Sequence, residues 1–253
     1  ELDRNIATSL RKVARIIAEK KRFDGTIKLA DVRKFLGIPK YSTNLAEKKD
    51  EGGMSTGLAW TEAGGDILFI EVAIMPGKGN LLLTGQLGDV MKESGQAAWS
   101  YVRSRWKVLG LKEKFYKDID VHVHVPEGAV PKDGPSAGIA LTTAIVSALT
   151  RMPVRRDVAM TGEVTLRGRV LEIGGLKEKI IAAHRAGIKR VIVPKENRKD
   201  MEEIPARVKS DLGITFASHM DEVLRIALRP ARSARQEVKE EVHPVRPQAV
   251  LRA

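Results

Sequence analysis

Short strand-like segments alternate with longer helical segments through most of this chain. Period-two alternation and β-branched residues predict strands at 57–61, 67–75, 81–84, 119–125, 158–161, 170–173 and 190–193. Apolar residues at helical spacing predict helices at 87–108, 135–149, 176–186, 201–208 and 220–228. Strands interleaved with helices of this length predict an α/β, or mixed α+β, domain over 54–228.

The two ends of the chain differ from this middle segment. Apolar residues at spacings of three and four predict an amphipathic helix at 2–21, and a second helix at 29–36 is stopped by Gly37 and Pro39. Residues 1–41 are therefore expected to form a small basic helical module. The polar stretch 42–53 has the composition of a linker, and the proline-rich, charged stretch 229–253 predicts a disordered basic tail.

The net charge of +12 raises the possibility of a nucleic-acid partner, so its distribution matters. Residues 1–49 carry 13 basic and 6 acidic side chains, and residues 229–253 carry 6 and 3. The middle segment, 50–228, carries 25 and 23 and is nearly neutral. Weak nucleic-acid binding through the N-terminal module is therefore an expectation, with a steep salt dependence.

Composition also excludes several kinds of site. The chain has no cysteine, so thiol nucleophiles, disulfides and thiolate metal sites are impossible, and a cytoplasmic location is consistent with this. Its five histidines form no zinc signature, so no metal site is predicted. No apolar run approaches the ~20 residues that span a bilayer, and no membrane partner is expected.

The densest signal for chemistry is the segment from Val125 to Ile139, where a predicted strand ends and a helix begins. Gly134 permits a tight turn, Pro135 suits the first helical position, and Ser136 falls in the first turn. A hydroxyl there lies beside backbone N–H groups that have no intrahelical acceptor and can stabilise an oxyanion. Two interpretations remain open: Ser136 is a nucleophile, or it only caps the helix or lines an anion site.

A serine nucleophile needs a base, and two kinds are available. His122 and His124 alternate with valines and point to one face of their strand, where they could pair with a serine or simply be exposed polar residues. Lys177 and Lys179 lie on the predicted helix 176–186, and Lys179 falls beside its alanines. A lysine desolvated in this way has a lowered pKa and can accept a proton near neutral pH, whereas an ordinary helix lysine is a solvated charge.

Three motifs in order resemble one enzyme family closely. They are Pro131-Lys-Asp-Gly-Pro-Ser-Ala-Gly138, Thr161-Gly-Glu-Val-Thr-Leu-Arg-Gly168 and Ile173-Gly-Gly-Leu-Lys-Glu-Lys-Ile-Ile-Ala-Ala-His-Arg-Ala-Gly187. They are similar to the peptidase domain of bacterial Lon, an ATP-dependent serine protease, over about residues 54–228. Residues 1–41 resemble the end of the small helical subdomain of the family's ATPase module.

The resemblance implies a Ser–Lys dyad. Ser136 matches the nucleophile and Lys179 the base, while Lys177, His122 and His124 match neither. Thr161 matches a threonine that orients the lysine. Asp133 matches an acidic residue that engages the lysine when the site is switched off.

The resemblance also implies the wider function. It predicts endopeptidase cleavage of unfolded or damaged proteins in quality control and the stress response, in a homohexamer of the bacterial cytoplasm. ATP and Mg²⁺ would serve a nucleotide-binding core that the sequence lacks, and no cofactor is expected in this chain. A substrate strand would add to a sheet edge at 57–60, with Ala59 and Trp60 in contact, although Trp60 could equally be core.

Overall fold

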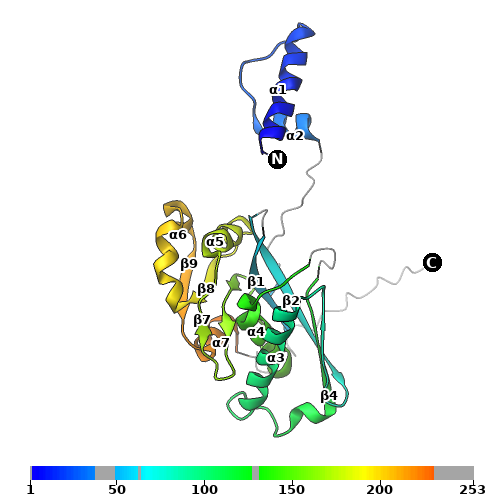
Figure 1. Cartoon of the computed structure of the whole chain (residues 1–253), viewed down its shortest axis with the longest axis vertical. Coiled ribbons are helices and arrows are strands. Elements are labelled where there is room, and N and C mark those ends of the chain that lie inside the picture. Colours follow the sequence, from blue (N-terminus) through cyan, green and yellow to red (C-terminus); the bar gives the residue numbers. More distant parts are fainter. Residues whose placement is uncertain (1, 38–48, 62–63, 127–130, 231–253) are drawn as a thin grey trace, which may run out of the picture. The chain divides into compact units, whose positions relative to one another are not determined.

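The computed structural model describes residues 2–37, 49–61, 64–126 and 131–230, and the chain divides into two compact units between Thr43 and Asn44 (Figure 1). This division falls within the predicted linker. The exact linker bounds stay a prediction, because 38–48 lie outside the described residues, as does the predicted tail from 231 onward. None of the described helices is long and apolar enough to cross a membrane.

The first unit contains two helices that pack together, α1 (Leu2–Ala18) and α2 (Leu29–Leu36). Helix α1 is shorter than predicted, because the chain turns at Lys20, which has a left-handed backbone with φ 53°. Its buried residues are Ser9 and Val13, while Leu2 and Ile17 remain largely exposed. The module is therefore amphipathic, as expected, with part of its apolar face uncovered.

The second unit is built on a mixed seven-stranded sheet in the order β3-β4-β2-β1-β5-β8-β9 (Figure 1). Strands β1, β2 and β4 pair antiparallel, whereas the pairs β3–β4, β1–β5, β5–β8 and β8–β9 are parallel. The strands are β1 (Met54–Thr61), β2 (Gly64–Pro76), β3 (Leu81–Thr84), β4 (Ile119–His124), β5 (Val158–Met160), β8 (Arg190–Pro194) and β9 (Gly213–Ala217). The predicted α/β class is confirmed.

Two hydrophobic cores lie on opposite faces of this sheet. Neighbouring residues of β5 alternate between them, since Val158 and Met160 belong to one core and Ala159 to the other. The first core is formed with α3 (Asp89–Ser104), α4 (Gly138–Thr150) and α7 (Met220–Ala227), and the second with α5 (Leu176–Arg185) and α6 (Ala206–Asp211). The central strands are thus buried on both faces, as parallel strands usually are.

Helix α4 is the most deeply buried helix of the first core. Ten of its residues are buried, because its sequence is apolar on every side rather than along one stripe. Its buried hydroxyls are satisfied internally: Thr142 Oγ1 donates to the Gly138 carbonyl at 2.8 Å and Thr143 Oγ1 to that of Ile139 at 2.7 Å. The helix can therefore lie in the core without unpaired polar groups.

The structure corrects one predicted helix and adds several elements. The helix predicted at 201–208 is wrong: a 3₁₀ segment, η3 (Lys195–Glu203), ends before Pro205, and α6 begins only after it. Proline lacks the N–H that a continuing helix needs, which explains the break. Strand β9, the short η1 (Phe115–Asp118) and β6 (Glu163–Val164) were not predicted, since such short segments give little periodicity. The strand predicted at 170–173 is present as β7 (Val170–Leu171), which forms a hairpin with β6.

We predict that Ile145→Ala, in the centre of α4, lowers the free energy of unfolding by about 2–5 kcal/mol, because the side chain is 0% exposed and its removal leaves a cavity. Leu166→Ala is the matched control, since Leu166 is 63% exposed, and its effect should stay within about 0.5 kcal/mol. Urea-induced unfolding measures both values. Equal effects of the two substitutions would contradict the central position of α4.

Candidate active site

Ser136 lies in a single 3₁₀ turn, η2 (Pro135–Ala137), that leads directly into α4. Gly134 precedes it with φ 116°, a conformation that L side chains rarely adopt, and Pro135 opens the turn as predicted. Ser136 itself is partly exposed. Neither η2 nor α4 has a side-chain cap in the described structure, so the interpretation of Ser136 as a capping residue is wrong.

The backbone of Ser136 is held by the segment that follows β5. Its carbonyl oxygen accepts hydrogen bonds from the Gly162 N–H at 2.8 Å and from Thr161 Oγ1 at 3.2 Å. The Ile139 N–H in turn donates to the Gly162 carbonyl at 3.1 Å. The turn that carries the serine is therefore fixed on both sides to the chain that carries Thr161.

Lys179 reaches the same place from the other layer of the molecule. It lies on α5, is only 3% exposed, and its Nζ donates to Thr161 Oγ1 at 3.2 Å. Lys177, two residues earlier on the same helix, is exposed. Burial thus separates the two candidate bases, and of the two only Lys179 has a hydrogen bond to Thr161 within the described part of the chain.

Burial lowers the pKa of Lys179 from its ordinary value of 10.5 to about 8. The cause is desolvation, because the surrounding residues replace water that would stabilise the ammonium form. A substantial fraction of this side chain is therefore a neutral amine with a free lone pair near pH 8. That is the protonation state that a general base requires.

The hydroxyl of Thr161 sets the direction of the hydrogen bonds between the two residues. Thr161 has one hydroxyl proton, and it must point to the Ser136 carbonyl, which can only accept. Thr161 Oγ1 is therefore the acceptor for a Lys179 N–H. Within the described residues no hydrogen bond joins Lys179 Nζ to Ser136 Oγ, so the amine lies close to the serine turn with its lone pair uncommitted.

Asp133 has a structural contact that the sequence did not suggest. Its carboxylate accepts hydrogen bonds from the N–H of Met91, in the first turn of α3, at 2.9 Å and from that of Gly134 at 2.8 Å. The residue at the N-cap of α3 is Gly88, which has no side chain of its own for this purpose. In the described structure Asp133 forms no ion pair with Lys179, and its expected role as the partner of the lysine stays a prediction.

The two strand histidines are engaged elsewhere. His122 Nε2 and His124 Nδ1 lie 2.8 and 2.7 Å from Thr84 Oγ1, on the face of β4 opposite its buried valines. Their hydrogen bonds therefore go to Thr84 and not to Ser136. No group of three His, Asp or Glu side chains suited to a metal ion occurs in the described part of the chain.

The expectation that 57–60 forms a sheet edge is wrong in part. Strand β1 lies in the middle of the sheet, and Gly57 pairs both with Leu68 on β2 and with Met160 on β5. Ala59 and Trp60 pair with β2 alone, because β5 leaves β1 after Met160. Trp60 is 59% exposed and so is not a core residue.

Comparison with known proteins adds the family. The model of the Lon protease (S16) C-terminal proteolytic domain matches residues 26–230. The chain belongs to the Lon protease family. The match begins well before residue 54, so the likeness extends further toward the N-terminus than the three motifs indicated.

Curated Lon proteases of bacteria are similar over the same region. "Lon protease 1" of Syntrophobacter fumaroxidans is 58% identical over 229 residues, 90% of this chain and 28% of the relative. "Lon protease" of Dictyoglomus thermophilum is 57% identical over 228 residues (90% and 29%), and that of Chloroflexus aggregans 59% over 233 residues (90% and 28%). The chain thus spans less than a third of the length of these relatives.

Gly162 was missed as a site residue of this Lon domain. Its N–H donates a hydrogen bond to the Ser136 carbonyl. A Cβ at this position would lie 2.9 Å from Val170 Cγ1, so there is no room for a side chain. A glycine directly after Thr161 in a motif was the available signal. Its partner 26 residues earlier in the chain could not be deduced from spacing.

We predict that Lys179→Met raises the free energy of unfolding at pH 7 by on the order of 1–3 kcal/mol, because it removes an amine that is charged below pH 8 and buried. Between about pH 8 and 10.5 the unfolded wild-type chain binds a proton that the folded chain does not. Wild-type stability therefore rises with pH across this window, and the advantage of Lys179→Met shrinks. Urea unfolding at a series of pH values measures this.

Lys177→Met is the matched control, since it removes an exposed lysine from the same helix. It should change stability little at any pH. The same pH response in both variants would show that burial does not lower the pKa of Lys179.

Proposed function

We propose that the unit from Asn44 onward hydrolyses peptide bonds, with Ser136 as nucleophile and Lys179 as general base. The observation that carries the proposal is the buried amine of Lys179. Its pKa is lowered to about 8, and Thr161 links it through two hydrogen bonds to the backbone of Ser136. Membership of a family of proteolytic domains supports the same reaction class.

In the first half of the reaction, neutral Lys179 takes the proton of the Ser136 hydroxyl as its oxygen attacks the scissile carbonyl carbon. The carbonyl oxygen becomes an oxyanion, and we propose the backbone N–H groups of η2 as the donors that stabilise it. The tetrahedral intermediate then collapses. Lys179 gives its proton to the leaving amine, and Ser136 keeps the acyl group.

In the second half, water replaces the amine. Lys179, neutral again, takes a proton from the water, and the water oxygen attacks the acyl carbonyl carbon. Collapse returns the proton to Ser136 Oγ and releases the carboxylic acid. The cycle needs no metal or organic cofactor, only a base that is neutral at the working pH.

The hydrogen bond to Thr161 restricts the orientation of the Lys179 amine. One Lys179 N–H donates to Thr161, so the remaining N–H groups and the lone pair point elsewhere around the nitrogen. We propose that rotation of the lysine or serine side chain completes the contact with Ser136 Oγ. Catalytic hydrogen bonds often shorten only when substrate binds.

We propose that the substrate binds in extended form along the last residues of β1. Ala59 and Trp60 have β2 on one side only, so their other side offers backbone N–H and C=O groups to a further strand. Trp60 packs on Gly175, at the start of the helix that carries Lys179. An extended chain bound there would lie beside α5.

The wider expectations are proposals for the longer protein. We propose unfolded or damaged proteins as substrates, a homohexamer in the bacterial cytoplasm as the working assembly, and ATP with Mg²⁺ as reactants of a separate nucleotide-binding core. Weak nucleic-acid binding by the N-terminal module is a secondary proposal based on its charge. None of these is required for the peptide-bond chemistry itself.

The decisive experiment is cleavage of an unstructured fluorogenic peptide without ATP. Wild type should cut, and both Ser136→Ala and Lys179→Met should lose at least about 10³-fold in kcat/KM, because each residue is needed for the same step. The wild-type rate should rise with pH through about 8, where Lys179 loses its proton. Circular dichroism checks that both variants fold.

Three further outcomes distinguish the alternatives. Activity that survives Lys179→Met but not His122→Ala or His124→Ala would point to a histidine base. Cleavage that survives Ser136→Ala would rule out the serine as nucleophile. A wild-type chain that forms rings and cuts nothing would identify an assembly domain with a silent dyad.

Thr161 provides a separate prediction. Thr161→Val keeps the shape but removes the hydroxyl, and we expect kcat to fall about 10- to 100-fold with little change in KM, because Lys179 is no longer oriented. Thr161→Ser retains the hydroxyl and should restore most of the activity. Equal losses in the two variants would indicate a packing role for a side chain that is 0% exposed.

A further inference from the structure

A chain of stacked side chains leads from the core to the surface at the C-terminal end of α3. Trp99, which is buried, meets Phe115 edge to face with ring centroids 5.8 Å apart, and Phe115 meets Tyr116 at the same distance. The guanidinium carbon of Arg103 lies 3.8 Å from the centre of the Tyr116 ring. The planar group of Arg103 is thus held in place by a rigid aromatic support.

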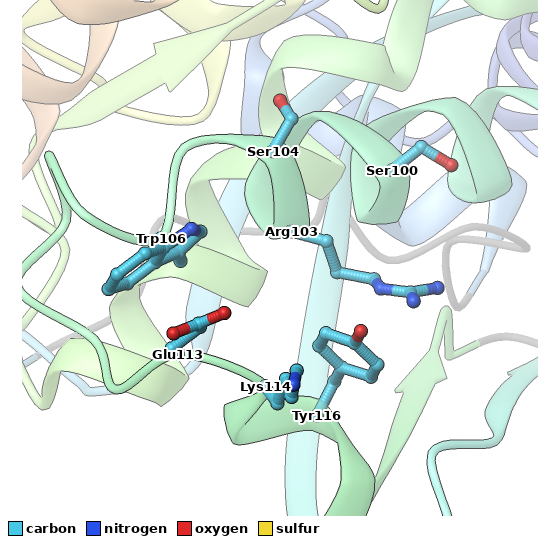
Figure 2. A pocket seen from close by; sticks show the side chains of 7 residues that line it. All are labelled: Ser100, Arg103, Ser104, Trp106, Glu113, Lys114 and Tyr116. Carbon is cyan, nitrogen blue, oxygen red and sulfur yellow. The ribbon is translucent and has the colours of Figure 1, made fainter.

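This support forms one wall of a cavity of about 410 Å³ (Figure 2). In that view Arg103 and Tyr116 lie on one side, Trp106 and Glu113 on the other, and Lys114 between Glu113 and Tyr116. An indole and a guanidinium therefore line the same cavity, together with a cation and a carboxylate. The volume is in the range of small-molecule sites.

The segment around this cavity is strongly basic, although the domain as a whole is nearly neutral. Residues 103–117 contain six basic side chains and one acidic side chain. Arg105 pairs with Asp221, but no ion pair in the described residues includes the other five. Those five are Arg103, Lys107, Lys112, Lys114 and Lys117. So many uncompensated cations in a short segment favour an anionic ligand.

The backbone of Lys114 supports a specific site. Lys114 has φ 59°, in the left-handed region that glycine adopts readily and that is strained for a lysine. Strained backbone of this kind clusters at ligand sites. The charged side chain of the same residue is on the lining of the cavity.

We propose that this cavity binds a nucleotide unit, either a free mononucleotide or one residue of a single-stranded nucleic acid. The base would stack on the Trp106 ring and the Arg103 guanidinium, as bases do on aromatic and arginine planes. The phosphate would meet Lys114 and the surrounding lysines. Glu113 would accept hydrogen bonds from ribose hydroxyls or from an exocyclic amine of the base.

Glu113 would make the cavity selective for a nucleotide over other anions. The Glu113 carboxylate on the lining of the cavity repels a simple polyanion, whereas a nucleotide brings hydrogen-bond donors that it can accept from. An acidic peptide would satisfy the lysines but has no flat group for Arg103 and Trp106. A nucleotide uses the planar, the cationic and the anionic groups of the cavity at once.

Isothermal titration calorimetry on the full chain at low salt tests the proposal, with AMP, inorganic phosphate, a short single-stranded oligo(dA) and poly-glutamate as probes. AMP or oligo(dA) should bind more tightly than phosphate or poly-glutamate. Arg103→Lys, which keeps the charge and loses the plane, and Trp106→Leu should each weaken nucleotide binding at least about tenfold.

Lys114→Gly should also weaken binding, while its backbone becomes less strained and the fold at least as stable. The matched control is Lys195→Ala, which removes an exposed lysine far along the chain from the cavity and should leave binding unchanged. Comparable affinities for AMP and oligo(dA) would identify a free nucleotide as the ligand. A much tighter oligo(dA) complex would identify a nucleic-acid strand.

Two results would overturn the proposal. Nucleotide binding that is indifferent to Arg103→Lys and Trp106→Leu would belong to other basic residues, such as those of the N-terminal module. Phosphate or poly-glutamate binding as tight as nucleotide binding would show a general anion surface. Neither result bears on Ser136 and Lys179, so the outcome is independent of the proposed peptidase activity.

Discussion

The burial of one amine is the constraint on which the site depends. Lys179 lies almost completely out of water, and its lowered pKa follows from that position alone. A lysine can be held there only if the surrounding structure compensates for the lost hydration. Leu176, Ile180 and Ala183 contribute by packing α5 into the second core, and Thr161 contributes a hydrogen-bond acceptor.

The serine reaches the same point from the opposite layer. Ala137, the residue after it, belongs to the first core, and the turn is continuous with α4. Thr161 follows β5, the strand whose residues alternate between the two cores. The site therefore forms beyond the carboxyl end of a strand buried on both faces, where the helices of the two layers meet.

The nucleotide cavity depends on neither of these residues. Its support runs from Trp99 in the first core through Phe115 and Tyr116 to Arg103 at the surface. Helix α3 links the two regions, because Asp133 accepts from its first turn while Arg103 lies in its last. A ligand at one end of this helix would thus act on an element that also holds the loop before Ser136.

The sequence by itself determined the class of the fold and indicated Ser136 and Lys179 as candidates for the proposed dyad. Alternating strand and helix patterns, the Gly134-Pro135-Ser136 turn and the alanines beside Lys179 are local features, and local periodicity and turn chemistry report them directly. It did not reveal the position of β1 inside the sheet, the hydrogen bond by which Asp133 caps α3, or the hydrogen bond from the Gly162 N–H to the Ser136 carbonyl. Each of these depends on contacts between residues far apart in the chain. Only tertiary packing decides those contacts, and it also decides which of two nearby lysines loses its water.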